Sequence, residues 1–147
     1  MNLFYLHEDP WRSAELHCDK HVVKMIIEYA QMLSTAHRML DGNQYTDSSS
    51  GRRIQRWELE NTNMDEVLYK ASHINHPSTR WVRENAVQYQ YAYDMFTALC
   101  DEYTYRYEIE YNNHISKVTF VCFNFPKTEQ NYFLKRSDQI KALYFSN

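Results

Sequence analysis

The sequence predicts a mostly α-helical fold, a compact single-domain helical bundle with two long helices. The 147 residues include only 2 glycines and 3 prolines, too few for the many tight turns of an all-β protein. Aromatic residues make up 16% of the chain, a share that disordered chains lack. A chain of this length can also form a hydrophobic core of its own.

The first long helix is predicted from His17 to Leu40. A shorter helical stretch precedes it, because Asp9 can cap a helix and Pro10 fits a first helical position. Asp19 is a candidate cap for a second start, so we expect the chain to bend near Cys18.

Shorter elements are predicted between the two long helices. The Asp-Gly pair at 41–42 ends the first one. Residues 43–57 are polar and are predicted to form a surface loop. A short helix is expected over Asp65–Ala71, with Asn61 or Thr62 near its start.

The second long helix is predicted from Thr79 to Tyr107, after a connector at residues 73–78. Apolar and aromatic side chains recur in it at steps of three and four, which predicts one buried face. The members of this face are Trp81, Val82, Tyr89, Tyr93, Phe96, Leu99, Cys100 and Tyr103.

Beyond this helix the pattern changes. Val118–Phe123 is predicted to be a strand, and Tyr132–Phe145 a final short helix. We therefore treat residues 1–147 as a single helical domain with a core at about 9–107 and a divergent tail at 108–147.

Charge and cysteine usage limit the class of protein. The formal net charge is −3, and the 3 cysteines are odd in number and show no Cys-x-x-Cys spacing. A disulfide framework is therefore not expected. No apolar run is long enough to cross a bilayer, and the signal-peptide pattern is missing, so we expect a cytoplasmic protein without a membrane partner. The acidic balance counts against nucleic-acid binding unless the cations gather on one face.

Polar side chains of the first long helix fall into one narrow sector when each residue advances by about 100°. They are His17, His21, Lys24, Glu28, Gln31 and Thr35. Two interpretations stay open. The sector is either a solvated strip with an ordinary Lys24–Glu28 pair or the wall of a site with acid–base chemistry. Two histidines on so narrow a strip favour the site.

A metal site is a weaker interpretation of the same strip. His17 and His21 are spaced so that two imidazoles can share one ion, and His73 and His76 lie three residues apart elsewhere. Zinc or non-haem iron would suit such ligands. Because the internal glutamate of His-Glu-x-x-His is missing, we predict no metal and no cofactor.

A second polar cluster is predicted where the connector meets the second long helix. It consists of Asn75, His76, Arg80, Trp81 and Arg83. A helix N-terminus attracts anions, two arginines suit phosphate and tryptophan suits base stacking. In the alternative interpretation, the tryptophan belongs to the core and the arginines pair with a nearby glutamate or with solvent.

Cations are concentrated between residues 52 and 83, whereas many acids lie between 94 and 110. Arg52, Arg53 and Arg56, with Trp57, form a basic–aromatic group. This asymmetry allows an anionic ligand despite the net charge.

Three blocks of the sequence, residues 17–25 (HCDKHVVKM), 73–78 (HINHPS) and 99–107 (LCDEYTYRY), resemble a group of uncharacterised bacteriophage proteins. More remotely, this layout resembles the phage pyrimidine-dimer DNA glycosylase (endonuclease V) family. That family is a small all-α domain whose first long helix carries Asp-x-His and, seven residues after the histidine, a catalytic glutamate.

Asp19, His21 and Glu28 match that spacing, and His76 matches a histidine near the start of the family's next long helix. The resemblance implies base excision, in which an amine displaces the base and forms a Schiff base that eliminates to nick the strand. Glu28 would stabilise the developing sugar cation and assist proton transfer. The amine would be that of Met1 or Lys24.

The leading hypothesis is therefore a phage DNA glycosylase/AP-lyase acting on a damaged or modified pyrimidine in the cytoplasm of an infected bacterium. The expected catalytic residues are Glu28, His21, Lys24 and His76, and the expected substrate-binding residues are Asp19, Asn75, Arg80, Trp81 and Arg83. Two alternatives are a non-enzymatic phage factor that binds a nucleotide or a host protein, and a metal-dependent phosphoesterase.

Overall fold

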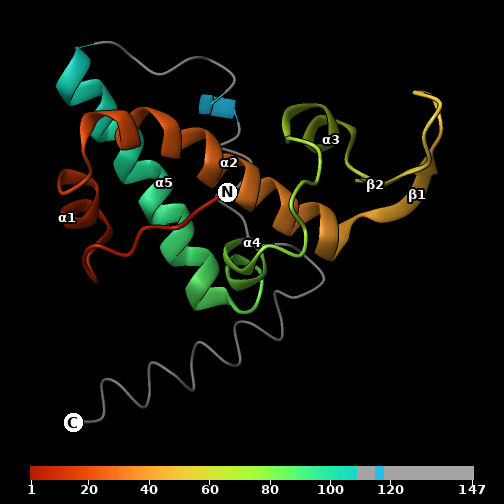
Figure 1. Cartoon of the computed structure of the whole chain (residues 1–147), viewed down its shortest axis with the longest axis horizontal. Helices are drawn as coiled ribbons and strands as arrows, with labels where there is room; N and C mark the ends of the chain where they lie inside the picture. The colour runs from red at the N-terminus through yellow and green to blue at the C-terminus, as the bar shows by residue number, and fades with distance from the viewer. Residues whose placement is uncertain (109–114, 118–147) are drawn as a thin grey trace, which may run out of the picture.

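A computed structural model describes residues 1–108 and 115–117 of the chain. This part is mostly helical, with two long helices and a small two-stranded sheet, as Figure 1 shows. The long helices are α2 (Asp19–Asp41) and α5 (Ala86–Tyr107), which pack against each other along their length. The predicted mostly helical class is thus confirmed. The predicted strand and helix in the tail lie outside the described residues.

The first short helix, α1 (Pro10–Glu15), begins as predicted. Asp9 is its N-cap and accepts hydrogen bonds from the backbone amides of Trp11 at 2.9 Å and Arg12 at 3.4 Å. Proline at the first helical position loses nothing, because an amide there has no partner inside a helix.

Helix α2 begins two residues later than predicted, at Asp19. Cys18 occupies the N-cap position and makes no side-chain cap hydrogen bond. The expectation that Asp19 caps this helix is therefore wrong, although its charge in the first turn complements the helix dipole. The predicted bend near Cys18 is confirmed, because α1 ends at Glu15.

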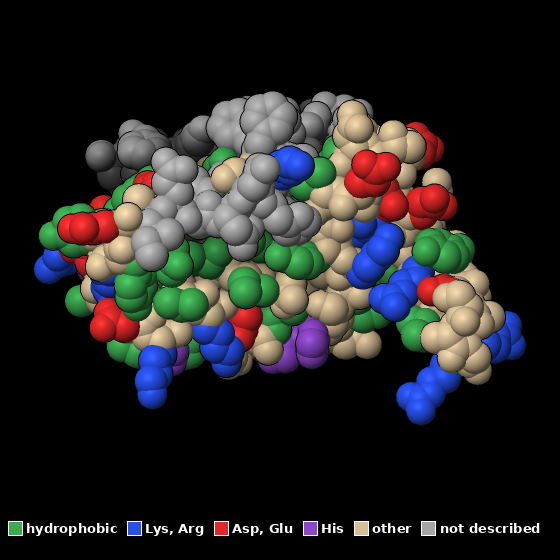
Figure 2. All heavy atoms as spheres, turned by 90° about the horizontal axis from the view of Figure 1, so that it is seen from above, with side chains coloured by type: hydrophobic (Ala, Val, Ile, Leu, Met, Phe, Trp, Pro, Cys, Tyr) green, Lys and Arg blue, Asp and Glu red, His purple; other side chains and the backbone are tan. Residues whose placement is uncertain are grey.

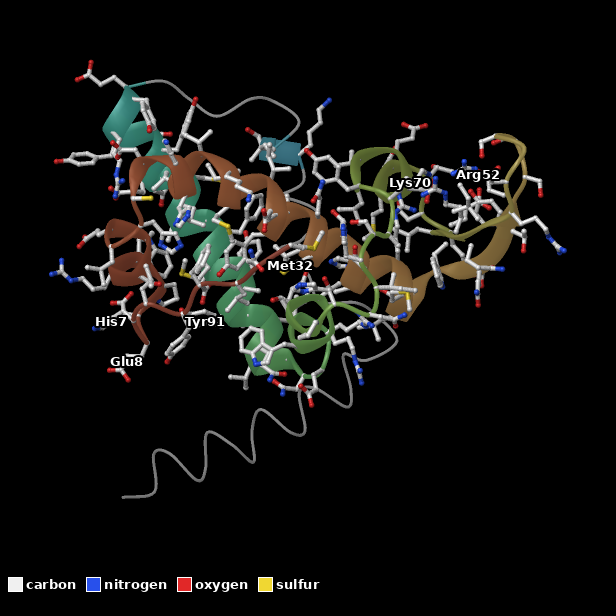
Figure 3. The ribbon with its side chains drawn as sticks, in the orientation of Figure 1. His7, Glu8, Met32, Arg52, Lys70 and Tyr91 are labelled. Atoms are coloured by element: carbon white, nitrogen blue, oxygen red, sulfur yellow. The ribbon has the colours of Figure 1, made fainter. Side chains whose placement is uncertain are left out.

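The core lies between the two long helices. Met32, labelled at the centre of Figure 3, is fully buried there. The largest fully buried apolar side chains of the pair are Met25, Tyr29, Met32 and Leu33 from α2 and Met95, Phe96 and Leu99 from α5. Apolar side chains of α2 are not all buried, since Val23 and Ile27 are 46% and 47% exposed.

Residues 43–57 form a β-hairpin and not the predicted loop. Strands β1 (Asn43–Asp47) and β2 (Ile54–Glu58) pair antiparallel, with Tyr45 opposite Arg56 and Gln44 opposite Trp57. The prediction fails because most of these side chains are exposed, so the strands lack the apolar–polar alternation that marks a half-buried sheet.

The second predicted helix is broken into two. Helix α4 (Pro77–Val82) ends first, and α5 starts afresh after Asn85, whose side chain accepts a hydrogen bond from the Gln88 amide at 3.0 Å. The side-chain cap of Asn85 offers the backbone an alternative to continuous helix. Helix α3 (Thr62–Val67) starts earlier than predicted, capped by Asn61.

The buried face predicted for the second helix is largely confirmed on both parts. Val82, Tyr89, Phe96, Leu99 and Cys100 are buried. The other three aromatic members of the face are partly buried and pack against the core.

A fully buried arginine, Arg38, fastens the hairpin and α3 to α2. Its guanidinium donates to the backbone carbonyls of Tyr69 at 2.6 Å, Trp57 at 2.9 Å and Leu68 at 2.8 Å. It also donates to the carboxylate and the carbonyl of Asp65. A buried cation is tolerated only when its hydrogen bonds are made, and here every nitrogen of the guanidinium is used.

Gly42 joins α2 to β1 at a point where there is no room for a side chain. A Cβ on Gly42 would collide with the carbonyl oxygen of Arg38 and lie 3.1 Å from the Cβ of Trp57. The glycine is therefore needed for close approach and not for a left-handed backbone, since its φ is −88°.

Among the helices that the structure describes, none is long and apolar enough to cross a bilayer.

Replacing Arg38 by methionine should lower the free energy of unfolding by about 3 kcal/mol or more, because four carbonyls and the Asp65 carboxylate lose their donor. Urea titration followed by circular dichroism would measure this. Arg12→Met is the control, since Arg12 is 60% exposed in its pair with Glu15, and should change the value by less than about 0.5 kcal/mol. A loss below about 1 kcal/mol for Arg38→Met would contradict the expectation.

Candidate functional site

The chain begins beside α2 and runs from there toward α1, as the red trace from N shows in Figure 1, and its second residue contacts Glu28. The backbone amide of Asn2 donates to one Glu28 carboxylate oxygen at 2.6 Å. The Lys24 ammonium lies 3.4 Å from the other oxygen. The Glu28 side chain is only 12% exposed, whereas Lys24 is 65% exposed. The carboxylate is thus held between the N-terminal segment and its own helix, next to an amine.

The same N-terminal segment reaches α4. The buried hydroxyl of Thr79 donates to the sulfur of Met1 at 3.3 Å. His76 stands three residues earlier, at the N-cap of α4, and its Nδ1 accepts from the Ser78 amide at 3.2 Å. Because Nδ1 is the acceptor, the neutral ring carries its proton on Nε2.

His21 lies against the other end of the segment. Its ring stacks on Phe4 with 4.8 Å between centroids and 13° between planes. Phe4 also meets His17 edge to face at 6.0 Å. Residues 1–4 therefore contact Glu28 and His21 on α2 and Thr79 on α4. Of the other two predicted catalytic residues, Lys24 lies beside Glu28 and His76 is the N-cap of α4.

Figure 2 shows histidine side chains near acidic and basic ones along the lower edge of one face of the molecule. An exposed amine, a largely covered carboxylate and imidazoles are the groups that acid–base and nucleophilic chemistry uses.

Asp19 has a different setting. It forms a 2.8 Å ion pair with Arg106, near the end of α5. Arg106 also donates to the carbonyls of His17 at 2.8 Å and Glu15 at 3.0 Å, which fixes the corner between α1 and α2. The nine residues from Asp19 to Glu28 amount to about 13 Å of helix, so this pair stands apart from the covered carboxylate.

The predicted substrate-binding cluster at α4 divides into packed and open members. Arg83 donates to the carbonyls of Ile74 at 2.5 Å and Thr79 at 3.1 Å, and burial, with Arg80 nearby, lowers its pKa. Trp81 is partly buried and packs edge to face on Tyr91 at 6.1 Å. Arg80 and Asn75 are exposed, so these two side chains are the ones open to a ligand.

Two histidines of α2 and its approach are buried. His17 is 2% exposed, its Nδ1 lies 2.7 Å from the Ser13 carbonyl, and burial lowers its pKa. His37 is 1% exposed, with Nε2 2.8 Å from the Tyr89 hydroxyl, and burial lowers its pKa to about 4. Both rings are therefore neutral near pH 7.

Within residues 1–108 and 115–117, no three histidine, cysteine, aspartate or glutamate side chains lie close enough to hold a metal ion together. His17 and His21, the pair with suitable spacing, have ring centroids 6.4 Å apart.

Arg38 and Arg106 organise the surroundings of the site, yet nothing in the sequence pattern marks them. Arg106 contacts residues almost ninety positions away, and such pairing leaves no periodic signal. The stacking of Phe4 on His21 is equally non-local.

Comparison with protein-family models, curated proteins and solved structures finds no match to this chain. The resemblance to phage DNA glycosylases therefore stays a prediction.

Burial of His37 predicts that stability falls in mild acid. Below about pH 6.5 the unfolded chain takes up a proton on this ring, while the folded chain does not until about pH 4. The free energy of unfolding should therefore fall across this window, by roughly 3 kcal/mol from His37 alone.

His37→Gln isolates this contribution, because an amide can bond to Tyr89 but does not titrate. Urea unfolding at a series of pH values should show a weaker pH dependence for the variant between pH 6.5 and 4. His17 acts in the same direction in both proteins and cancels in the difference. Identical pH profiles for the two proteins would contradict the expectation.

Proposed function

We propose that this protein is a DNA glycosylase/AP-lyase that acts on a damaged or modified pyrimidine through an amine beside Glu28. The observation that carries the proposal is the Lys24 ammonium 3.4 Å from a carboxylate that is only 12% exposed. The Asn2 amide at 2.6 Å holds the other oxygen and brings the start of the chain to the same carboxylate.

The chemistry needs a neutral amine and a group that moves protons. In the proposal, Glu28 accepts a proton from an adjacent ammonium, which frees the amine to attack the sugar C1′. The C1′–N bond to the base breaks as the new C–N bond forms, and the base leaves with a proton. At an abasic sugar, the amine adds to the aldehyde and water leaves, which gives a Schiff base. Removal of a C2′ proton then expels the 3′ phosphate and breaks the strand. A carboxylate near C1′ also stabilises positive charge that develops on the sugar.

The surrounding residues suit a DNA substrate. His76 has an Nε2 proton to donate, and His21 lies against the segment that covers Glu28. Asn75, which precedes α4, and Arg80, in its last turn, are exposed and can contact phosphate. We also propose that the protein comes from a phage and acts in the cytoplasm of an infected bacterium. A single helical domain over residues 1–147 is part of the same proposal.

The experiment is borohydride trapping on a duplex with one abasic site. Borohydride reduces the Schiff base to a stable amine, so the full chain should form a covalent adduct with the DNA. Glu28→Gln should slow adduct formation by about 100-fold or more, since general acid–base groups contribute at least that much. Peptide mapping of the adduct would show whether the sugar is attached to Lys24 or to the amino group of residue 1.

Glu66→Gln is the matched control, because Glu66 is an exposed glutamate on α3, and it should trap at the rate of the parent. Circular dichroism confirms that each variant is folded. Failure of the folded parent to form an adduct would overturn the proposal, as would equal trapping by Glu28→Gln. Tight nucleotide binding without any adduct would favour the non-enzymatic alternative.

A further inference from the structure

The β1–β2 hairpin extends from the C-terminal end of α2, away from the bundle of helices, as Figure 1 shows at its right. Residues 48–57, which form its turn and most of β2, contain three arginines and no acid, although the chain as a whole has a net charge of −3. The acids of the hairpin are Asp47 at the end of β1 and Glu58 at the end of β2, so its positive charge is concentrated at and beside the turn.

The two arginines at the turn are exposed and are not used by the fold. Within residues 1–108 and 115–117, neither Arg52 nor Arg53 forms a hydrogen bond or an ion pair. By contrast, Arg38, Arg83 and Arg106 donate to backbone carbonyls. Neither guanidinium is needed to hold the turn, so both are available to contact an anion.

Further cations lie around the base of the turn. Figure 3 labels Arg52 on the hairpin and Lys70 toward α3. The Lys70 ammonium is 55% exposed and lies 3.7 Å from Asp65, while the Arg56 guanidinium lies 3.9 Å from Asp47. Each of these two cations faces a carboxylate, so among the described residues the unpaired positive charge at this end of the hairpin is that of Arg52 and Arg53.

The turn itself is held in shape. The Asp47 carboxylate accepts from the Ser49 amide at 2.9 Å and the Ser49 hydroxyl at 2.7 Å. Gly51 takes the left-handed φ of 75° that a side chain would oppose. Across the strands, the Gln44 side-chain amide donates to the Gln55 side-chain oxygen at 3.1 Å. The arginines therefore project from a preformed loop, and little order has to be gained on binding.

The chemistry of the hairpin fits nucleic acid better than a membrane. Its turn, residues 48–53, has no apolar side chain that could enter a bilayer. Its strands expose amide and hydroxyl groups, which can bond to phosphates and base edges. A two-stranded ribbon also has the width to enter the DNA major groove.

The reach of the hairpin from Glu28 is comparable with one turn of a duplex. Helix α2 continues for about 20 Å beyond Glu28, and a five-residue strand adds at most about 17 Å, a reach that the angle between them shortens. One turn of DNA is about 34 Å. In Figure 2 the basic side chains at the hairpin end reach toward the same lower edge as the histidines.

We propose that the hairpin is a DNA-binding arm whose Arg52 and Arg53 contact duplex phosphates about one helical turn from the nucleotide at Glu28. This inference rests on the proposed function, since it assigns the duplex at Glu28 as the ligand. The arm supplies positive charge for phosphate contacts in a chain whose net charge is negative.

The test measures the salt dependence of binding by the full chain. The probe is a fluorescein-labelled duplex of about three helical turns with a tetrahydrofuran abasic analogue at its centre, and the readout is anisotropy. The double variant R52A/R53A should bind roughly tenfold more weakly at low salt. Its slope of log Kd against log salt should be smaller by about 1.8, as expected for two lost phosphate contacts.

The charge-matched control is K20A/K117A, which also removes two exposed cations, on α2 and at residue 117. It should keep the slope of the parent. A duplex truncated to about half a turn on each side of the analogue should abolish the difference between R52A/R53A and the parent. Equal effects of the two double variants, or a difference that persists on the short duplex, would overturn the arm.

Vesicles of phosphatidylserine and phosphatidylcholine test the other anionic surface. Sedimentation with vesicles that depends on Arg52 and Arg53, without such dependence on the duplex, would also overturn the inference. The outcomes separate the two proposals. Duplex binding without borohydride trapping overturns the lyase chemistry alone, whereas trapping with unchanged binding by R52A/R53A overturns the arm alone.

Discussion

The buried guanidinium of Arg38 is the interaction on which the rest of the structure depends. It joins α2 to the end of β2 and to the segment after α3. Taking a cation out of water costs several kcal/mol, and only a full set of acceptors offsets this cost. The positions of α3 and the hairpin thus depend on this polar geometry as well as on the apolar packing of Leu59 and Leu68.

Arginines in this chain serve two purposes. Arg38, Arg83 and Arg106 turn inward and fix corners, each by donating to carbonyls of irregular segments. Arg52 and Arg53 face solvent on the hairpin. A planar fork of five donors suits both purposes, since backbone carbonyls and phosphates accept the same hydrogen bonds. Counting arginines in the sequence could not separate the two kinds.

Local signals in the sequence predict the helices but not their relation to each other. The caps at Asp9 and Asn61 and the period of α2 are visible because each depends on neighbours a few residues apart. The hairpin is not predicted because most side chains of its strands are exposed, so no apolar–polar alternation marks them. The break before α5 is not predicted because no glycine or proline marks it. At the site, spacing alone placed Lys24 beside Glu28. The covering residues 1–4 could not be predicted, since their contacts span long stretches of chain.

The close approach at Gly42 has a consequence for how this fold tolerates substitution. The direction in which the hairpin leaves α2 depends on the lack of a side chain at Gly42, because any Cβ there would meet the carbonyl of Arg38 and the side chain of Trp57. A single methyl group at this position would push the helix end and the strand apart at the place where Arg38 holds them together. Substitutions on the surface of the hairpin leave its direction unchanged, whereas even a methyl group at Gly42 would change the direction of the whole hairpin.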